Sequence, residues 1–419
     1  MPQNLEHMLQ AYGDLAVRIG LDLQPGQRLL IIGPLASGGV SLEAAQLVEA
    51  VTGSAYKAGA RLVEAIWGDD ALQLIRFKHA PRDSFSESSA WLPKALFEHA
   101  EAGNALLSIY ANDPDQLKDQ DPAFIGALTH ATARNFRPFR ELISRNQTTW
   151  TVVAAATASW AAKVFPNLDP AQQVSHLWEA IGRLCRLDRS DPIAAWRAHL
   201  TALAARRDRL NEKQYTTLKY AAPGTNLTVG LPVGHTWVSG RSISRSGIAF
   251  CPNLPTEEVF TMPHKDRVDG TVRSSKPLSY GGTVIDGFGL RFAGGRVVHL
   301  KAERGEPVLR KLLETDHGAG RLGELALVPH SSPVAQSGLL FYNTLFDENA
   351  ASHLALGSAY KFTLNGGDAL DDEAFERAGG NRSAAHVDFM IGSADLDVDG
   401  ILADGSVEPV MRRGEWAFE

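Results

Sequence analysis

Four segments in the second half of the sequence place histidine or carboxylate side chains among apolar residues. They span residues 255–261, 322–328, 343–353 and 385–392. An ionised carboxylate inside an apolar run loses its hydration, which is costly unless the group is paired or bound to a metal ion. Four such segments in one chain therefore predict a site at which these side chains converge.

The two histidines of these segments each allow a structural interpretation as well as a chemical one. The residues around His386 and Asp388 are typical of a β-strand, in which side chains two positions apart share a face. An imidazole beside a carboxylate can bind a metal ion, or the two can form a structural pair. His353 lies near the end of a helix that we predict over 347–356, with Gly357 as its stop, where the helix dipole alone would favour a histidine. Both interpretations stay open for each histidine taken alone.

The carboxylates complete a donor set of two imidazoles and three carboxylates without a thiolate. Glu324 follows Gly323 and precedes a strand-like run. Of the adjacent Glu257 and Glu258, only one can face the same side of a strand, and the choice depends on a register that stays open here. This donor set suits Zn²⁺, Co²⁺, Mn²⁺ or Fe²⁺ and disfavours copper(I) and iron–sulfur clusters.

Charge favours two metal ions over one at such a site. Three carboxylates around a single divalent ion leave a net charge of about −1, which would weaken its pull on an incoming oxygen, whereas around two ions the balance is about +1. A positive balance acidifies a bridging water and polarises a carbonyl, as in metal pairs roughly 3.5–4 Å apart. The sequence has no H-E-x-x-H motif, which disfavours single-zinc helical protease chemistry.

The elements that must position these residues differ between the two halves of the chain. In the first half, apolar periodicity predicts a helix over 5–20, strands over 28–33, 61–67, 105–110 and 150–155, and helices beginning at Ser41, before Val174 and at Asp191-Pro192. Strand, helix and strand in succession imply a parallel sheet. After residue 211, short β-rich runs alternate with turn dipeptides such as Pro223-Gly224, Gly281-Gly282 and Gly294-Gly295. We therefore expect an N-terminal α/β domain with a mostly parallel sheet over 1–211, and a C-terminal α+β domain rich in antiparallel strands over 212–419 that carries the metal site.

Length and composition are consistent with two globular domains and exclude several classes of protein. The 419 residues are 44% hydrophobic and 21% charged, and the net charge of −7 lacks the basic excess of a nucleic-acid-binding protein. There is no apolar run of about 18 residues and no export signal, so we expect a cytoplasmic protein without a membrane span. Cys185 and Cys251 are too few for a disulfide scaffold or a thiolate metal site, and we expect them to be packing residues.

The four segments resemble metallo-aminopeptidases of the aminopeptidase T and aminopeptidase S (PepS) type. The matching strings are PTEEVFT at 255–261, LGE at 322–324, NTLFDENAASHLALGSAY at 343–360 and HVDFMIG at 386–392. The long string is highly specific, and the short ones gain weight from their order along the chain. The resemblance covers most of the sequence, including the LQPGQ turn at 23–27.

This resemblance implies a co-catalytic pair of divalent ions in the C-terminal domain, drawn from Zn²⁺, Co²⁺, Mn²⁺ or Mg²⁺. The implied ligands are Glu258, Glu324, His353, His386 and Asp388, so the resemblance selects the second of the two adjacent glutamates. It also implies a site tyrosine at Tyr360, a homodimer, and the release of N-terminal amino acids from short peptides. Glu348, which is acidic within the same string, is our candidate general acid–base.

The resulting hypothesis is hydrolysis of the N-terminal peptide bond of short peptides. One ion would receive the free α-amine, a metal-bound hydroxide would attack the carbonyl, and a metal with the Tyr360 hydroxyl would stabilise the oxyanion. One alternative is a mononuclear non-haem iron oxygenase that uses His353, His386 and Asp388 as a facial triad, which leaves the two glutamates unexplained. The other is a non-catalytic peptide-binding protein whose N-terminal domain is the ligand module.

Overall fold

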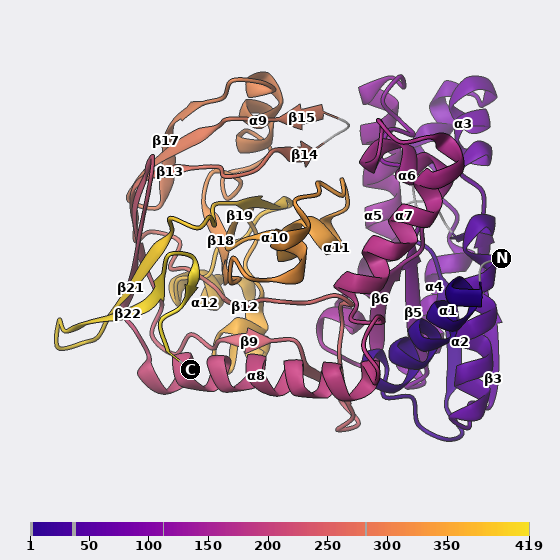
Figure 1. Ribbon diagram of the computed structural model, residues 1–419. Coiled ribbons are helices and arrows are strands. Elements are labelled where there is room, and N and C mark those ends of the chain that lie inside the picture. Colours follow the sequence, from indigo (N-terminus) through magenta and orange to yellow (C-terminus); the bar gives the residue numbers. More distant parts are fainter. Residues whose placement is uncertain (1–2, 36–38, 112, 281–282, 419) are drawn as a thin grey trace. The chain divides into compact units, whose positions relative to one another are not determined.

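The computed structural model describes residues 3–35, 39–111, 113–280 and 283–418. The chain divides into two compact units (Figure 1). The first unit comprises Met1–His199, Arg241–Pro255 and Phe341–Leu345, and the second comprises Leu200–Gly240, Thr256–Leu340 and Phe346–Glu419. Residue 211, at which we predict a domain boundary, lies in helix α8 (Pro192–Lys213).

The first unit is built on a four-stranded parallel sheet with the strand order β3-β1-β5-β6. Its strands are β1 (Arg28–Ile32), β3 (Leu62–Ala65), β5 (Ala105–Tyr110) and β6 (Trp150–Ala154). Each predicted strand of this half is present, and the parallel pairing is confirmed. Residues 29–32 of β1 are all buried, as expected for a strand covered on both faces.

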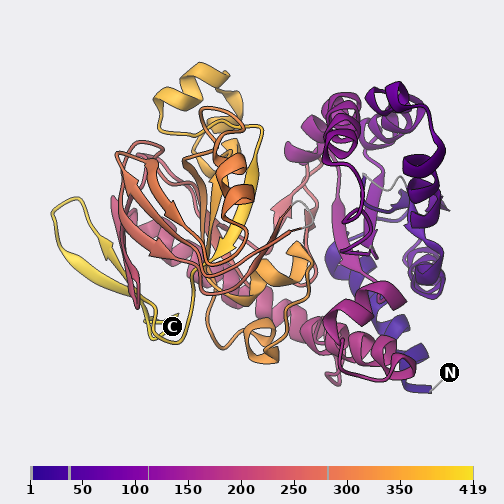
Figure 2. The ribbon, with the colours of Figure 1, turned by 90° about the horizontal axis from the view of Figure 1, so that it is seen from above.

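Helices cover both faces of this sheet (Figure 2). Leu30 and Leu106 of the sheet pack against Leu96 and Phe136 from two of these helices. From another helix, the hydroxyl of Tyr12 accepts a hydrogen bond of 3.1 Å from the backbone N–H of Ala154. The helices are α1 (Gln3–Leu15), extended by a π-helical turn over Ala16–Gly20, α2 (Ala45–Lys57), α3 (Asp70–His79), α4 (Trp91–Glu101), α5 (Pro122–Ser144), α6 (Ala158–Val164) and α7 (Pro170–Leu184). Short pairs are formed by β2 (Val40–Ser41) with β4 (Trp67–Gly68) and by β10 (Ser242–Ile243) with β11 (Ala249–Phe250).

Side-chain caps explain where several helices begin. The predicted cap at Ser41 accepts a hydrogen bond from the N–H of Glu43 at 3.3 Å, and that at Asp191 accepts one from the N–H of Ala194 at 2.9 Å. Helix α5, which we did not predict, begins with the same Asp-Pro pair, Asp121-Pro122. The local signal for α5 was therefore present in the sequence.

The described residues of the second unit form two large antiparallel sheets and the short antiparallel pair β14-β15, as expected for a half rich in antiparallel strands. The eight-stranded sheet has the order β17-β16-β13-β8-β7-β21-β22-β23, and the five-stranded sheet has the order β20-β19-β18-β12-β9. Pro223-Gly224 joins β7 to β8 and Gly294-Gly295 joins β16 to β17, whereas residues 281–282 lie outside the described residues.

The strands of the eight-stranded sheet are β7 (Thr217–Ala222), β8 (Thr225–Gly230), β13 (Val268–Arg273), β16 (Gly289–Ala293), β17 (Arg296–Lys301), β21 (Asp397–Ile401), β22 (Val407–Arg412) and β23 (Glu415–Trp416). Those of the five-stranded sheet are β9 (Val238–Ser239), β12 (Val259–Thr261), β18 (Leu322–Leu327), β19 (His353–Gly357) and β20 (His386–Met390). The remaining elements are β14 (Leu278–Tyr280), β15 (Thr283–Ile285), α9 (Glu306–Leu313), α10 (Pro333–Ser337), α11 (Thr344–Asp347) and α12 (Asp372–Arg377).

One face of the five-stranded sheet belongs to the core of this unit. It presents fully or nearly fully buried apolar side chains, namely Leu325, Leu327, Leu354, Leu356, Val387 and Phe389. The ring of Phe389 lies 5.5 Å from that of Phe288, the residue before β16. With its apolar side chains on this face, the sheet can place polar groups on the other one.

The prediction of a helix over 347–356 is wrong. A single 3-10 turn over Glu348–Ala350 is followed by strand β19, which begins at His353. This strand pairs with β18 on one side and β20 on the other. Hydrogen bonding to two neighbouring strands therefore outweighs the local helical pattern.

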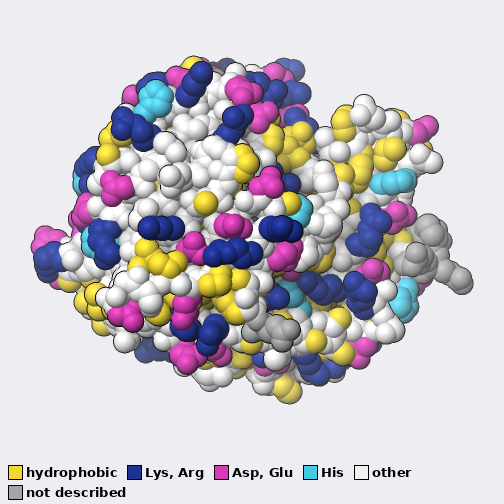
Figure 3. Space-filling model, turned by 60° about the vertical axis from the view of Figure 1, so that its left-hand side comes forward, with side chains coloured by type: hydrophobic (Ala, Val, Ile, Leu, Met, Phe, Trp, Pro, Cys, Tyr) yellow, Lys and Arg dark blue, Asp and Glu magenta, His cyan; other side chains and the backbone are white. Residues whose placement is uncertain are grey.

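Charged side chains of both signs are interspersed on the face shown in Figure 3. This agrees with the absence of a large basic excess in the composition. Among the described residues, no helix combines the length and the apolar content needed to cross a membrane.

Candidate metal site

Strand register brings the predicted ligands to one face of the five-stranded sheet. Asp388 on β20 lies opposite Ala355 on β19, and His386 lies opposite Gly357. On the other side of β19, Ala355 lies opposite Glu324 of β18. Residues directly opposite one another in an antiparallel pair share a face, and so do residues two apart on one strand. His353, two residues before Ala355, therefore shares this face with Glu324, His386 and Asp388.

A one-residue irregularity in β18 is what turns Glu324 to this face. Leu322 lies opposite Leu356 on the core side, yet Glu324 lies opposite Ala355, so the register shifts by one between them. This is a β-bulge, and the extra residue is Gly323. Without it, Glu324 would share the core face with Leu322.

The same alternation distinguishes the two adjacent glutamates. On β12, Phe260 lies opposite Ala326, the site-facing neighbour of Glu324. Glu258, two residues before Phe260, continues on that face, and its Oε2 lies 3.1 Å from Nε2 of His353. Glu258 is thus the member of the pair that joins the cluster.

The five side chains form two overlapping groups of potential ligands. Glu258, Glu324 and His353 make one group and Glu324, His386 and Asp388 make the other, with the donor atoms in each lying within 4.8 Å of one another. Nε2 of His353 lies 3.7 Å from Oε1 of Glu324, and Nε2 of His386 lies 3.7 Å from its Oε2. Nε2 of His386 also lies 3.6 Å from Oδ1 of Asp388. Glu324 directs one oxygen to each group.

This grouping does not fit the facial triad of the oxygenase alternative. Within the described part of the chain, His353 is not grouped with His386 and Asp388, because Glu324 lies between them. A single ion held by those three residues would leave out the carboxylates of Glu258 and Glu324.

Backbone carbonyls orient both imidazoles. Nδ1 of His353 lies 3.1 Å from the carbonyl of Ala351, and Nδ1 of His386 lies 2.7 Å from the carbonyl of Ser358. A carbonyl oxygen only accepts hydrogen bonds, so Nδ1 carries the proton in each neutral ring. The lone pair then lies on Nε2, which faces the carboxylates and is free to bind a metal ion.

The electrostatics of the cluster favour a cation. Glu324 is 5% exposed, and burial raises its pKa to about 7, a rise to which the charges of Asp388 and Glu258 add. Burial lowers the pKa of His353, but hydrogen bonds to Glu258 and Glu324 outweigh it and raise this pKa well above its usual value. Oδ1 of Asp388 is buried without a hydrogen-bond partner. A buried acceptor of this kind calls for a bound ion, and three carboxylates with two imidazoles fit divalent metals.

Glu348 and Tyr360 lie beside this cluster. Burial raises the pKa of Glu348 well above its usual value, and repulsion by Glu258 and Asp388 adds to the rise. The ring centroid of Tyr360 lies 4.9 Å from that of His386. Although 39% of the Tyr360 surface is exposed, nearby protein atoms desolvate its hydroxyl and, with the charges of Glu324 and Asp388, raise its pKa. The phenol is therefore protonated at neutral pH.

Two further aromatic side chains, which we did not predict from the sequence, border the site. The ring of Phe362 stacks on Tyr360 at 5.1 Å, and Phe260 lies 6.5 Å from Tyr360 and 6.3 Å from Phe362. Phe260 and Phe362 are half-buried. We call Phe260, Tyr360 and Phe362 the aromatic rim. The spacing of Phe260, two residues after Glu258 on one strand, was the signal available for it.

Comparisons with known proteins find similarity over nearly the whole chain. A family model described as thermophilic metalloprotease (M29) matches residues 5–416. Aminopeptidase 2 of Geobacillus stearothermophilus is 51% identical over 414 residues, which are 99% of this chain and 98% of that protein. Aminopeptidase PepS of Streptococcus thermophilus is 41% identical over 416 residues, 99% of each chain. The solved structure of wild-type AmpT from Thermus thermophilus has a TM-score of 0.92 and 44% identity, and covers 98% of this chain and 99% of its own.

Proposed function

This chain belongs to the thermophilic metalloprotease (M29) family, and we propose that it removes the N-terminal amino acid from short peptides with the help of two divalent metal ions. The observation that carries the proposal is the pair of overlapping ligand groups that share Glu324. Glu258 and His353 would complete one ion site, and His386 and Asp388 the other. Bound there, the two ions would supply an acidified water, close to a hydroxide, and a polarised carbonyl.

The chain's own residues would account for the preference for the N-terminus of a peptide and for proton transfer during hydrolysis. The three ligand carboxylates leave about one positive charge at a centre of two divalent ions, which suits a neutral α-amine and a peptide carbonyl as incoming donors. Burial raises the pKa of Glu348, and in the metal-free protein repulsion by Glu258 and Asp388 adds to the rise. Metal ions that neutralise those carboxylates would remove the repulsive part of this rise and favour the ionised form of Glu348, which could then accept a proton from the attacking water and deliver it to the leaving amine.

Tyr360 is the proposed donor to the oxyanion of the tetrahedral intermediate. Its hydroxyl is protonated at neutral pH, and its ring lies beside the ligand His386. A donor held in place before the reaction stabilises charge that develops only in the transition state.

The test is removal and restoration of the metal ions. Protein treated with a chelator should lose hydrolysis of leucyl-amide and of leucine-containing dipeptides, and should regain it on addition of Zn²⁺, Co²⁺, Mn²⁺ or Mg²⁺. The same substrates with an acetylated N-terminus should be inert. Metal analysis should find two ions per chain, and one ion per chain would contradict the paired centre.

We further propose a cytoplasmic homodimer, on the basis of the resemblance that the sequence bears to aminopeptidases T and PepS. Light scattering on the purified full chain tests the assembly, with twice the 45.3 kDa chain mass as the expected result. Cell fractionation tests the location.

A further inference from the structure

A short backbone segment is linked to three residues of the metal site, namely Glu324, Tyr360 and His386. This segment, residues 357–359, begins with the last residue of strand β19 and leads to Tyr360. The N–H of Gly357 donates to the carbonyl of Arg321 at 2.8 Å, and the N–H of Ser358 donates to the carbonyl of Ala385 at 2.8 Å. The carbonyl of Ser358 accepts the hydrogen bond from Nδ1 of His386. The position of this segment therefore sets the orientation of the His386 ring.

Two glycines allow this segment to pack against the strands on either side. A Cβ on Gly323 would lie 2.3 Å from the carbonyl oxygens of both Gly357 and Ser358. Gly357 has a φ of +108°, and a Cβ there would lie 2.1 Å from the carbonyl oxygen of Ala385. Gly323 immediately precedes Glu324, and Ala385 immediately precedes His386. A shift of the segment would thus displace two of the five ligands.

Asn381 is the side chain that anchors this segment. It is 1% exposed, and its Nδ2 donates to the carbonyl of Gly357 at 2.6 Å and to that of Gly318 at 2.8 Å. Its own backbone carbonyl accepts a hydrogen bond of 2.8 Å from the N–H of Ala359. Asn381 thus holds the segment at both of its ends.

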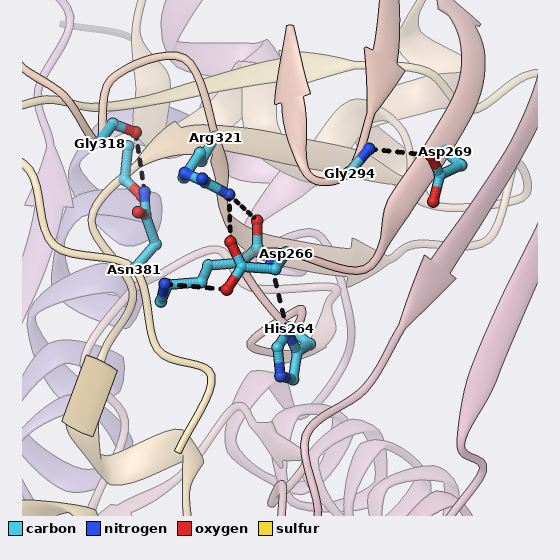
Figure 4. Close-up of polar contacts among 9 residues, drawn as sticks. His264, Asp266, Asp269, Gly294, Gly318, Arg321 and Asn381 are labelled. Atoms are coloured by element: carbon cyan, nitrogen blue, oxygen red, sulfur yellow. Dashed lines mark hydrogen bonds and ion pairs between the residues drawn. The ribbon is translucent and has the colours of Figure 1, made fainter. Parts of the chain in front are cut away.

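The loop to which Asn381 attaches the segment makes further hydrogen bonds, some of which Figure 4 shows. The carbonyl of Gly318 also accepts a hydrogen bond of 3.0 Å from the backbone N–H of Arg321. The Arg321 side chain, 7% exposed, donates through Nη1 to Oδ1 of Asp266 at 2.7 Å and to the carbonyl of Lys265 at 2.6 Å. Asn381 therefore links the segment to a loop that further hydrogen bonds hold in place.

We propose that Asn381 is a positioning residue for the metal site, an inference that rests on the proposed function. By holding residues 357–359, it keeps the Ser358 carbonyl at Nδ1 of His386, so that Nε2 faces Glu324 and Asp388. Hydrogen-bond partners of this kind orient metal-binding histidines and fix their tautomer, and their loss typically weakens metal binding by about 10–100-fold. Here the partner of His386 is a backbone carbonyl, and Asn381 is what holds that carbonyl in place.

The experiment compares Asn381→Ala with a matched control, Asn211→Ala. Asn211 also makes two hydrogen bonds to backbone, from its Nδ2 to the carbonyl of Trp237 at 2.9 Å and to its Oδ1 from the N–H of Trp237 at 2.8 Å. It belongs to the same unit of the chain but has no contact with residues 357–359 among its described hydrogen bonds. Asn381→Ser, whose hydroxyl can satisfy only one of the two carbonyls, provides a milder variant that folds if Asn381→Ala does not.

The probe is Co²⁺ alone, with its affinity measured by competition with a chelator and its coordination followed by visible absorption. We expect a 10–100-fold loss of Co²⁺ affinity and a changed spectrum in the Asn381 variants, against wild-type values in Asn211→Ala. A folded Asn381 variant with wild-type affinity and spectrum would overturn the proposal, and so would an equal loss in Asn211→Ala. If wild-type protein binds Co²⁺ but does not hydrolyse peptides, the proposed function fails while the test of Asn381 stands.

Discussion

Replacing Glu324 by glutamine should make the metal-free protein more stable at neutral and alkaline pH. The pKa of Glu324 rises from 4.5 to about 7 on folding, chiefly because burial removes the hydration of the ionised carboxylate. A group whose pKa is raised in the folded state favours folding when protonated. Its contribution is therefore fully present below pH 4.5 and is lost as the pH rises to 7 and above.

The size of this effect follows from the two pKa values. The rise from 4.5 to about 7 corresponds to a cost of about 3 kcal/mol for the ionised form at pH 8. Glutamine has nearly the same shape and no charge, so Glu324→Gln removes this cost. At pH 5 the wild-type carboxyl is largely protonated in the folded state, and the difference between the two proteins should shrink to less than about 1 kcal/mol.

The assay is urea unfolding of chelator-treated protein at pH 8 and at pH 5. Glu324→Gln should exceed the wild type in free energy of unfolding at pH 8 by about 3 kcal/mol. The control Glu373→Gln, whose side chain is 87% exposed, should match the wild type at both pH values. Added metal should reverse the order by stabilising the wild type alone, because Glu324 belongs to both ligand groups. A metal-free variant less stable than the wild type at pH 8 would refute the reasoning.

Three further predictions concern the chemistry of the site. Metal affinity should fall as the pH is lowered from 8 to 6, because the raised pKa values of Glu324 and His353 place protons on donor atoms that must release them to bind a metal ion. Calorimetry in buffers of different ionisation enthalpy measures the number of protons released. Binding that does not depend on pH would contradict this prediction. Tyr360→Phe should lower kcat for leucyl-amide by about 10²-fold with little change in KM, and an unchanged kcat would remove Tyr360 from the proposed role. Phe260→Ala should lower the leucyl to alanyl ratio of kcat/KM by about 10-fold, because the aromatic rim lies beside the ligands; an equal loss for both substrates would indicate distortion of β12 instead.

The parallel sheet of the first unit could be predicted because its strands are short, continuous apolar runs. Four helices of this unit, α3, α4, α5 and α6, were missed, and exposed apolar side chains account for part of this. Leu72 and Ile75 of α3, for example, are 64% and 54% exposed. Their starts were nevertheless signalled in part, since Asp69 and Asp121 cap α3 and α5.

The convergence of the five predicted side chains could be predicted, but not the way in which they group around Glu324. Five side chains follow from their types, their setting and the resemblance. The choice between Glu257 and Glu258 depends on the pairing of β12 with β18, which lies far away in the sequence. The strand at His353 was mistaken for a helix because its pairing with β18 and β20 is likewise non-local. The double role of Glu324 depends on the bulge before it, which no periodic pattern predicts.

The bulge at Gly323 leaves the ligand set exposed to one kind of genetic change. Replacing this glycine by a larger residue that cannot form the bulge would restore regular alternation in β18 and carry the Glu324 carboxylate through the sheet to the layer that contains Leu322 and Leu356. All five ligands would still be present and in the same order, yet the carboxylate common to both groups would be gone. In related chains, an intact list of ligand residues is therefore weaker evidence of a working centre than the same list together with a glycine at the position of Gly323.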